Sequence, residues 1–139
     1  MKTLYEATVT SEGGRSEGRV KSSDGILDLK ITAPKELGGN GSETNPEQLF
    51  AAGYAACFES ALQLVAKNKK LNLTSTKVVA HVGIGSDTKG RYQLSVKLEI
   101  YIKGVSKEEG SMLVSQAHLV CPYSNAIRNN IDVRLEFIP

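Results

Sequence analysis

Asn45-Pro-Glu-Gln-Leu-Phe-Ala-Ala-Gly-Tyr-Ala-Ala-Cys57-Phe58 is the stretch that decides how this chain folds. Its asparagine is suited to the N-cap of a helix, Pro46 to the first helical position, and Gln48 completes a capping-box pattern. The sequence therefore predicts a helix from Pro46 to about Asn68. Residues 49–58 are apolar on nearly every side, so we expect the helix to be central and buried all round.

Small residues run along this predicted helix. They are Ala51, Ala52, Gly53, Ala55 and Ala56. They would let another backbone pack closely, and in a chain of this length the neighbour could be the same helix from a second subunit.

Alternating apolar and polar residues predict strands on both sides of the helix. Such alternation is typical of half-buried strands in antiparallel sheets. The predicted strands lie at Tyr5–Val9, near Val20, and at Leu27–Ile31, Val78–Ile84, Leu94–Ile102 and Ile131–Phe137.

A second helix is predicted to begin at Ser106-Lys-Glu-Glu109, which is another capping box, and to end near Val120. Pro122 follows, and a short helical turn is expected to reach Arg128. The order β-β-β-α-β-β-α-β favours a single α+β domain over residues 1–139, with antiparallel sheets around a long central helix.

Composition excludes several classes of function. The 139 residues are 40% hydrophobic, which suits one domain with a real core. The 17 basic and 15 acidic residues are interspersed, so no concentrated basic face is available for nucleic acid. The N-terminus has no signal-peptide core, and we expect no run of the roughly 18 apolar residues that span a membrane. We therefore expect a cytoplasmic protein, in which thiols stay reduced.

The two cysteines, Cys57 and Cys121, are then either inert core residues or catalytic groups. A thiol reacts as its thiolate, and burial of Cys57 in mid-helix would raise its pKa. A reactive Cys57 therefore needs a cation nearby. The candidate cations are Arg15, Arg19, Arg91, Arg128 and Arg134.

Cys121 is placed differently. It would be the N-cap of the turn that begins at Pro122, near the free N–H groups of that turn.

Other chemistries have less support. His81 and His118 stand in no CxxC or HxxxH pattern with the cysteines, and His81 is expected to face solvent. A cysteine hydrolase with His118 as base lacks a third group. The glycine run at 38–41 matches no phosphate-binding pattern. Because neither the histidines nor this run fits a ligand site, we expect neither a metal nor a bound cofactor.

Two long motifs resemble the organic hydroperoxide resistance proteins of the OsmC-like superfamily. Thr44–Phe58 is similar to the first cysteine motif of that family and Ala117–Ala126 to the second. Gly13-Gly14-Arg15 resembles its early arginine motif. The resemblance covers essentially the whole chain. It implies the OsmC-like fold, an intertwined homodimer with active sites at the subunit interface.

The resemblance also implies a thiol peroxidase that reduces alkyl and fatty-acid hydroperoxides to alcohols in defence against oxidative stress. Cys57 would be the peroxidatic thiolate and Cys121 the resolving thiol. Arg15 matches the arginine that stabilises the thiolate, and Glu47 the glutamate that orients it. The implied reductant is an external dithiol, typically a dihydrolipoyl protein.

Apolar walls from Phe50, Tyr54 and Phe58 would favour an alkyl hydroperoxide over hydrogen peroxide. An alternative is a non-catalytic OsmC-like stress protein whose pocket carries apolar ligands. Because Glu47 precedes Cys57 by ten residues, about 15 Å along one helix, we hypothesise that each active site draws on both chains of a dimer.

Two departures from the family pattern carry their own predictions. Glu59 is expected to point away from Cys57 around the helix and to be exposed. Asn129 stands where a glycine is common and should adopt a left-handed backbone conformation.

Overall fold

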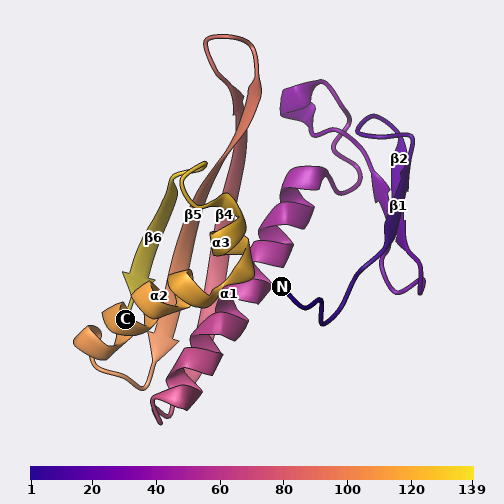
Figure 1. Cartoon of the computed structure of the whole chain (residues 1–139). Helices are drawn as coiled ribbons and strands as arrows, with labels where there is room; N and C mark the ends of the chain where they lie inside the picture. Colours follow the sequence, from indigo (N-terminus) through magenta and orange to yellow (C-terminus); the bar gives the residue numbers. More distant parts are fainter. The chain divides into compact units, whose positions relative to one another are not determined.

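The structure, a computed structural model, describes residues 1–139 and confirms the α+β class. Contacts divide the chain into two compact units, Met1–Leu49 and Phe50–Pro139, and each is described by itself. The elements are β1 Val9–Glu12, β2 Gly18–Ser22, β3 Asp28–Ile31, the short 3-10 helix η1 Lys35–Leu37, α1 Pro46–Asn68, β4 Ser75–Ser86, β5 Tyr92–Lys103, α2 Lys107–Val120, α3 Pro122–Ile127 and β6 Val133–Ile138 (Figure 1).

The first unit is built on an antiparallel sheet of order β1-β2-β3. The prediction of a strand at Tyr5–Val9 is wrong for most of its length, because β1 begins only at Val9. Val9 pairs with Ser22, where β2 ends in a turn, so the residues before Val9 have no partner strand.

Helix α1 begins in this first unit, where its N-cap is as predicted. Asn45 Oδ1 accepts a hydrogen bond of 2.9 Å from the backbone N–H of Gln48. The second half of the capping box is absent, because the Gln48 side chain accepts instead from Thr44 Oγ1 at 2.7 Å. The helix ends at Asn68, as predicted.

The expectation that α1 is buried all round is wrong for the single chain. Ala52, Ala56 and Leu64 are exposed, whereas Tyr54 and Phe58 are buried. The apolar sequence therefore leaves one face of α1 open. This helix is also long and apolar enough to cross a membrane by length and composition alone, contrary to expectation, but the core helix of a soluble protein meets the same criterion.

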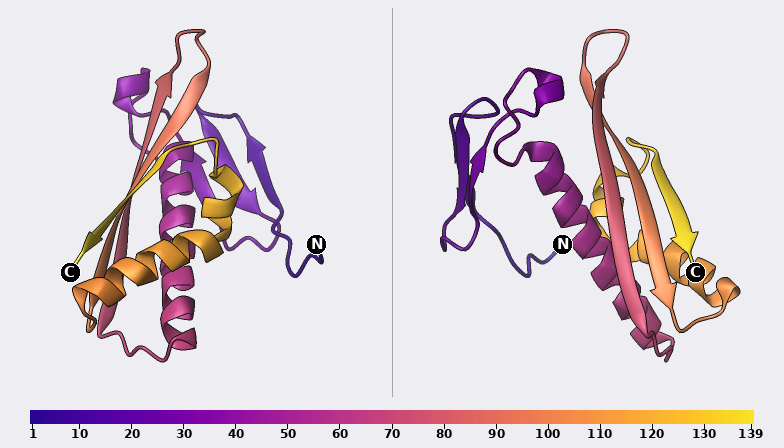
Figure 2. Two further views of the ribbon diagram at one scale, coloured as in Figure 1. Left: turned by 60° about the vertical axis from the view of Figure 1, so that its left-hand side comes forward. Right: turned by 180° about the vertical axis from the view of Figure 1, so that it is seen from behind.

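The second unit contains a sheet of order β4-β5-β6. Strands β4 and β5 form an antiparallel hairpin, but β6 lies parallel to β5. The expectation of purely antiparallel sheets is therefore wrong at β6. Helices α2 and α3 connect β5 to β6 and supply the crossover that a parallel pair requires (Figures 1 and 2).

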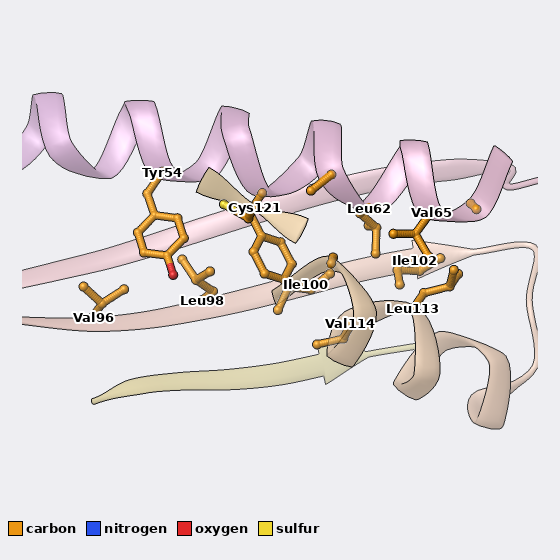
Figure 3. Close-up of a cluster of buried hydrophobic side chains, with 14 of the residues drawn as sticks. Tyr54, Leu62, Val65, Val96, Leu98, Ile100, Ile102, Leu113, Val114 and Cys121 are labelled. Atoms are coloured by element: carbon orange, nitrogen blue, oxygen red, sulfur yellow. The ribbon is translucent and has the colours of Figure 1, made fainter. Parts of the chain in front are cut away.

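The core of this unit lies between the sheet and the helices. Alternate residues of β5 are buried: Val96, Leu98, Ile100 and Ile102. Tyr54, Leu62 and Val65 point from α1 toward these strands (Figure 3). Burial of each large aliphatic side chain contributes about 1.5–3 kcal/mol, so this seam fixes the position of α1 on the sheet.

Candidate thiol site

The fold brings the two cysteines together. Cys121 Sγ lies 3.7 Å from Cys57 Sγ, although 64 positions separate them in the chain. Both thiols are free, Cys57 half-buried and Cys121 completely buried. Because sulfurs in a disulfide are about 2.05 Å apart, a small movement would allow these two to bond.

Cys121 is held by backbone bonds on both sides. It ends α2, where its N–H donates to Ala117 O at 2.8 Å, and it is also the N-cap of α3. Its carbonyl accepts from the N–H of Asn125 at 3.0 Å. Pro122 is the first residue of α3, as predicted, because a proline there lacks only an N–H that would go unused. Cys121 is therefore held at a fixed corner between two helices.

Cys57 has no cation among the groups that set its pKa. Burial raises the pKa of this thiol, and the neighbouring Cys121 raises it further, while a backbone N–H bond from Tyr123 lowers it. Since Cys57 lies in the middle of α1, no helix end assists it. The environment within the second unit thus favours the neutral thiol, as the sequence predicts for Cys57 without an arginine.

Arg15 and Glu47, which the sequence motifs single out, meet within the first unit. Arg15 Nη1 and Nη2 donate to the two carboxylate oxygens of Glu47 at 2.9 and 2.6 Å. This bidentate pair raises the pKa of Arg15 and lowers that of Glu47. Arg15 follows the turn at Gly13, whose φ of +84° suits glycine. This turn lets the Arg15 guanidinium reach Glu47.

The other candidate cations bond to groups other than Cys57 or form no ion pair. Arg19 pairs with Asp28, and Arg91 with Asp87. Arg128 donates to the side chain of Asn125 and to the carbonyl of His118. No ion pair is found for Arg134.

A buried polar chain beside Cys121 was not anticipated from the sequence. Tyr54 Oη and Ser124 Oγ are 2.7 Å apart, and His118 Nδ1 lies 2.8 Å from the same Ser124 oxygen. Tyr54 and Ser124 are fully buried. Burial and the nearby Arg128 lower the pKa of His118, so its ring is held neutral. The available signal was the spacing of His118 and Ser124 on either side of Cys121.

The aromatic residues near the thiols differ in exposure. Tyr54 and Phe58, predicted as walls of a substrate pocket, are completely buried in the single chain. Phe50 is half-buried, and Tyr123 is 37% exposed. The ring of Tyr123 lies 6.0 Å from that of Phe50, edge to face, and 5.7 Å from that of Tyr54. Tyr123, which was not predicted from the sequence as a site residue, is thus the exposed aromatic residue near the thiols.

Three smaller expectations are settled by local contacts. His81 is exposed, as predicted, and bonds to Glu99 at 2.6 Å. Glu59 is partly exposed and accepts from Thr76 Oγ1 at 2.8 Å, and it is not among the groups that shift the pKa of Cys57. Asn129 has a φ of +64°, which confirms the left-handed prediction. No group of three or more His, Cys, Asp or Glu side chains gathers in a way that could hold a metal.

Comparison with known proteins gives one consistent result. A sequence profile described as OsmC-like protein matches residues 39–136. The organic hydroperoxide resistance protein of Xanthomonas axonopodis pv. citri (strain 306) is 53% identical over 136 residues, covering 96% of this chain and 94% of that protein.

Solved structures agree. The structure described as organic hydroperoxide resistance protein OsmC from Legionella pneumophila is 46% identical, with a TM-score of 0.96 over 99% of this chain and 100% of that one. An organic hydroperoxide resistance protein from Elizabethkingia anophelis, with thiocyanate bound, is 51% identical, with a TM-score of 0.94 over 99% and 98% of the two chains.

Proposed function

We propose, because this chain belongs to the OsmC-like protein family and to its organic hydroperoxide resistance branch, that it is a thiol peroxidase which reduces organic hydroperoxides to alcohols. Family membership supports the coarser role, defence against organic hydroperoxides. The single observation that supports the thiol mechanism is the 3.7 Å separation of Cys57 Sγ and Cys121 Sγ.

The proposed reaction has two steps on the protein. The Cys57 thiolate attacks one peroxide oxygen, the O–O bond breaks, and the departing alkoxide takes up a proton to become the alcohol. Cys57 is left as a sulfenic acid. The Cys121 sulfur then attacks the Cys57 sulfur, the S–O bond breaks, and the thiol proton leaves with the hydroxyl as water. An external dithiol reduces the resulting disulfide by exchange and is itself oxidised to a disulfide.

Arg15 is proposed as the cation that Cys57 lacks. A guanidinium lowers the pKa of a neighbouring thiol, and its planar donors can also stabilise charge on the leaving oxygen. Glu47 holds both terminal nitrogens of Arg15, so its proposed role is to orient that side chain. The pair resembles the arrangement that the sequence motifs imply.

We further propose that each active site draws on two chains. The open face of α1, with Ala52 and Ala56 exposed, offers small residues on which a second copy could pack closely. Phe50 and the exposed Tyr123 supply apolar surface suited to an alkyl group. The proposed reductant is a dihydrolipoyl protein, and the proposed setting is the cytoplasm, where such dithiols are kept reduced.

Consumption of cumene hydroperoxide in the presence of excess dithiol tests the peroxidase. Wild-type protein is expected to consume the hydroperoxide catalytically, and Cys57→Ser to show only the rate of the dithiol alone. Equal rates for wild type and Cys57→Ser would reject the proposal in favour of a non-catalytic protein that binds apolar ligands.

A further inference from the structure

Gly53 lies so close to the ring of Tyr123 that a side chain at position 53 would collide with the ring. A Cβ atom added to Gly53 would be 2.4 Å from Tyr123 Oη and 2.9 Å from its Cζ, whereas ordinary contact begins at 3.4 Å. Glycine in a helix interior is destabilising relative to alanine. Its presence in the middle of α1 is therefore accounted for by the close approach of this ring.

The ring belongs to Tyr123, a residue that lies close to both thiols. Tyr123 follows Cys121 by two positions, in the first turn of α3. Its ring packs against Phe50 and Tyr54 on α1, and its backbone N–H is among the groups that lower the pKa of Cys57. Because the ring is packed between Phe50 and Tyr54, with ring centroids 6.0 and 5.7 Å away, its freedom to turn aside on its own torsions is restricted, and we expect part of any displacement to pass to the turn that carries Cys121.

We infer that Gly53 is a positioning residue for disulfide formation: by admitting the Tyr123 ring, it holds Cys121 Sγ within reach of Cys57 Sγ. The inference rests on the function proposed above. The step that it serves is attack of the Cys121 sulfur on the Cys57 sulfenic acid, in which an S–S bond forms, the S–O bond breaks and water leaves. No further reactant is needed.

In Gly53→Ala, less of the Cys57 sulfenic acid is expected to form the disulfide and more of it to be overoxidised. Raising the Cβ to Oη distance from 2.4 Å to 3.4 Å requires a shift of about 1 Å at the Tyr123 ring. If this shift is passed to Cys121 Sγ, a misplacement of up to about 1 Å can cost up to about 10²-fold in the rate of disulfide formation. The measured quantity is the partition of Cys57 sulfenic acid between disulfide and overoxidised forms, read by intact mass over a series of cumene hydroperoxide concentrations. This ratio is independent of how fast the sulfenic acid forms. It should fall about 10- to 100-fold.

Gly110→Ala is the matched control. Gly110 is also a helix glycine against an aromatic ring, since an added Cβ would lie 2.2 Å from Phe137 Cζ, between α2 and β6. This variant should lose stability without changing the partition. Tyr123→Ala provides the second control, because it removes the ring. Adding Gly53→Ala to Tyr123→Ala should leave the partition of that variant unchanged.

Three results would overturn the inference: a wild-type partition in Gly53→Ala, an equal fall in Gly110→Ala, or the same fall when Gly53→Ala is added to Tyr123→Ala. Diamide separates this inference from the peroxidase, because one thiolate adds to its N=N bond and the second thiol then attacks the bound sulfur, forms the S–S bond and releases the hydrazine. Slow conversion of the diamide adduct to the disulfide in Gly53→Ala supports the positioning role even if hydroperoxide leaves the wild-type thiols intact. Conversion of the adduct at the wild-type rate contradicts it.

Discussion

Cys121 Sγ lies 3.7 Å from Cys57 Sγ, across the junction between the middle of α1 and the corner that joins α2 to α3. Cys121 is completely buried, whereas Cys57 is partly accessible. The accessible sulfur is therefore suited to meet a substrate and the buried one to react only with its neighbour. This inequality matches the proposed division between peroxidatic and resolving thiols.

Cys121→Ser should leave the first reaction intact and abolish the second. Without the neighbouring thiol, the Cys57 sulfenic acid persists and excess cumene hydroperoxide oxidises it further, adding about 16 Da per oxygen. Intact mass spectrometry after a short exposure should show these adducts in Cys121→Ser and a disulfide in wild type. A Cys121→Ser protein that gains no oxygen would contradict the role of Cys57.

Arg15→Ala should slow the reaction of Cys57 at neutral pH. Loss of a neighbouring cation raises a thiol pKa by about 1–3 pH units, so the thiolate fraction at pH 7 falls about 10- to 1,000-fold. The midpoint of the pH–rate profile should therefore move to higher pH, and the rate should recover in alkaline buffer. Stopped-flow measurement of cumene hydroperoxide reduction from pH 5 to 10 would show this.

Arg19→Ala is the matched control for that experiment. Arg19 forms a bidentate pair with Asp28 in the same unit as Arg15, with both contacts at 2.6 Å. Its removal deletes an equivalent surface ion pair and should leave the pH–rate profile in place. Equal shifts in the two variants would show that general electrostatics, and not Arg15, sets the thiol reactivity.

Arg15→Ala and Cys57→Ser should complement each other if each site draws on two chains. In randomly re-formed dimers about half are hybrids, and each hybrid has one intact site of two, so activity should return to about a quarter of wild type. The measurement is hydroperoxide turnover at pH 7, where Arg15→Ala is slow and Cys57→Ser inactive, after the two variants are unfolded and refolded together. Absence of any recovery, with hybrids confirmed by mass, would place each site within one chain.

Ser124→Ala should destabilise the second unit. It leaves the Tyr54 hydroxyl and His118 Nδ1 without their partner in a buried setting, at a cost of about 1–3 kcal/mol. Urea unfolding would measure this cost. Ser115→Ala, at an exposed position of α2, should change stability by less than about 0.5 kcal/mol.

His118 should make stability depend on pH in the mildly acidic range. Its pKa is lowered in the folded chain, so as pH falls below the ordinary value of about 6.5 the unfolded chain binds a proton that the folded chain does not. Stability is complete above that pH and is lost as pH falls toward the folded pKa. His118→Gln should flatten the fall in melting temperature between pH 7.5 and 5.5. An unchanged slope would contradict this assignment.

The local elements could be predicted because their signals lie within a few residues. The N-cap at Asn45, the capping box at Ser106 and Glu109, and the break at Pro122 all depend on neighbours in the sequence. The parallel pairing of β6 with β5 could not be predicted in this way. Alternation marks a half-buried strand without stating its direction, which is set by the crossover through α2.

The candidate site shows the same division. The proposed roles of Cys57 and Cys121 were inferred from their motifs, but the proximity of the two sulfurs depends on packing of α1 against α3 across 64 positions. No local signal in the sequence indicated that Tyr54 and Phe58 would be buried and Tyr123 exposed. An apolar residue on a helix reads the same whether it faces a sheet or a substrate, and only the position of the sheet separates the two.

A single turnover of the reduced protein shows whether Cys57 and Cys121 form a redox pair. Reduced wild-type protein is mixed with one equivalent of cumene hydroperoxide, and intact mass and free thiols are measured after denaturation. We predict loss of both thiols and a mass decrease of about two daltons, the signature of a Cys57–Cys121 disulfide. Unchanged thiols and unchanged mass would contradict it.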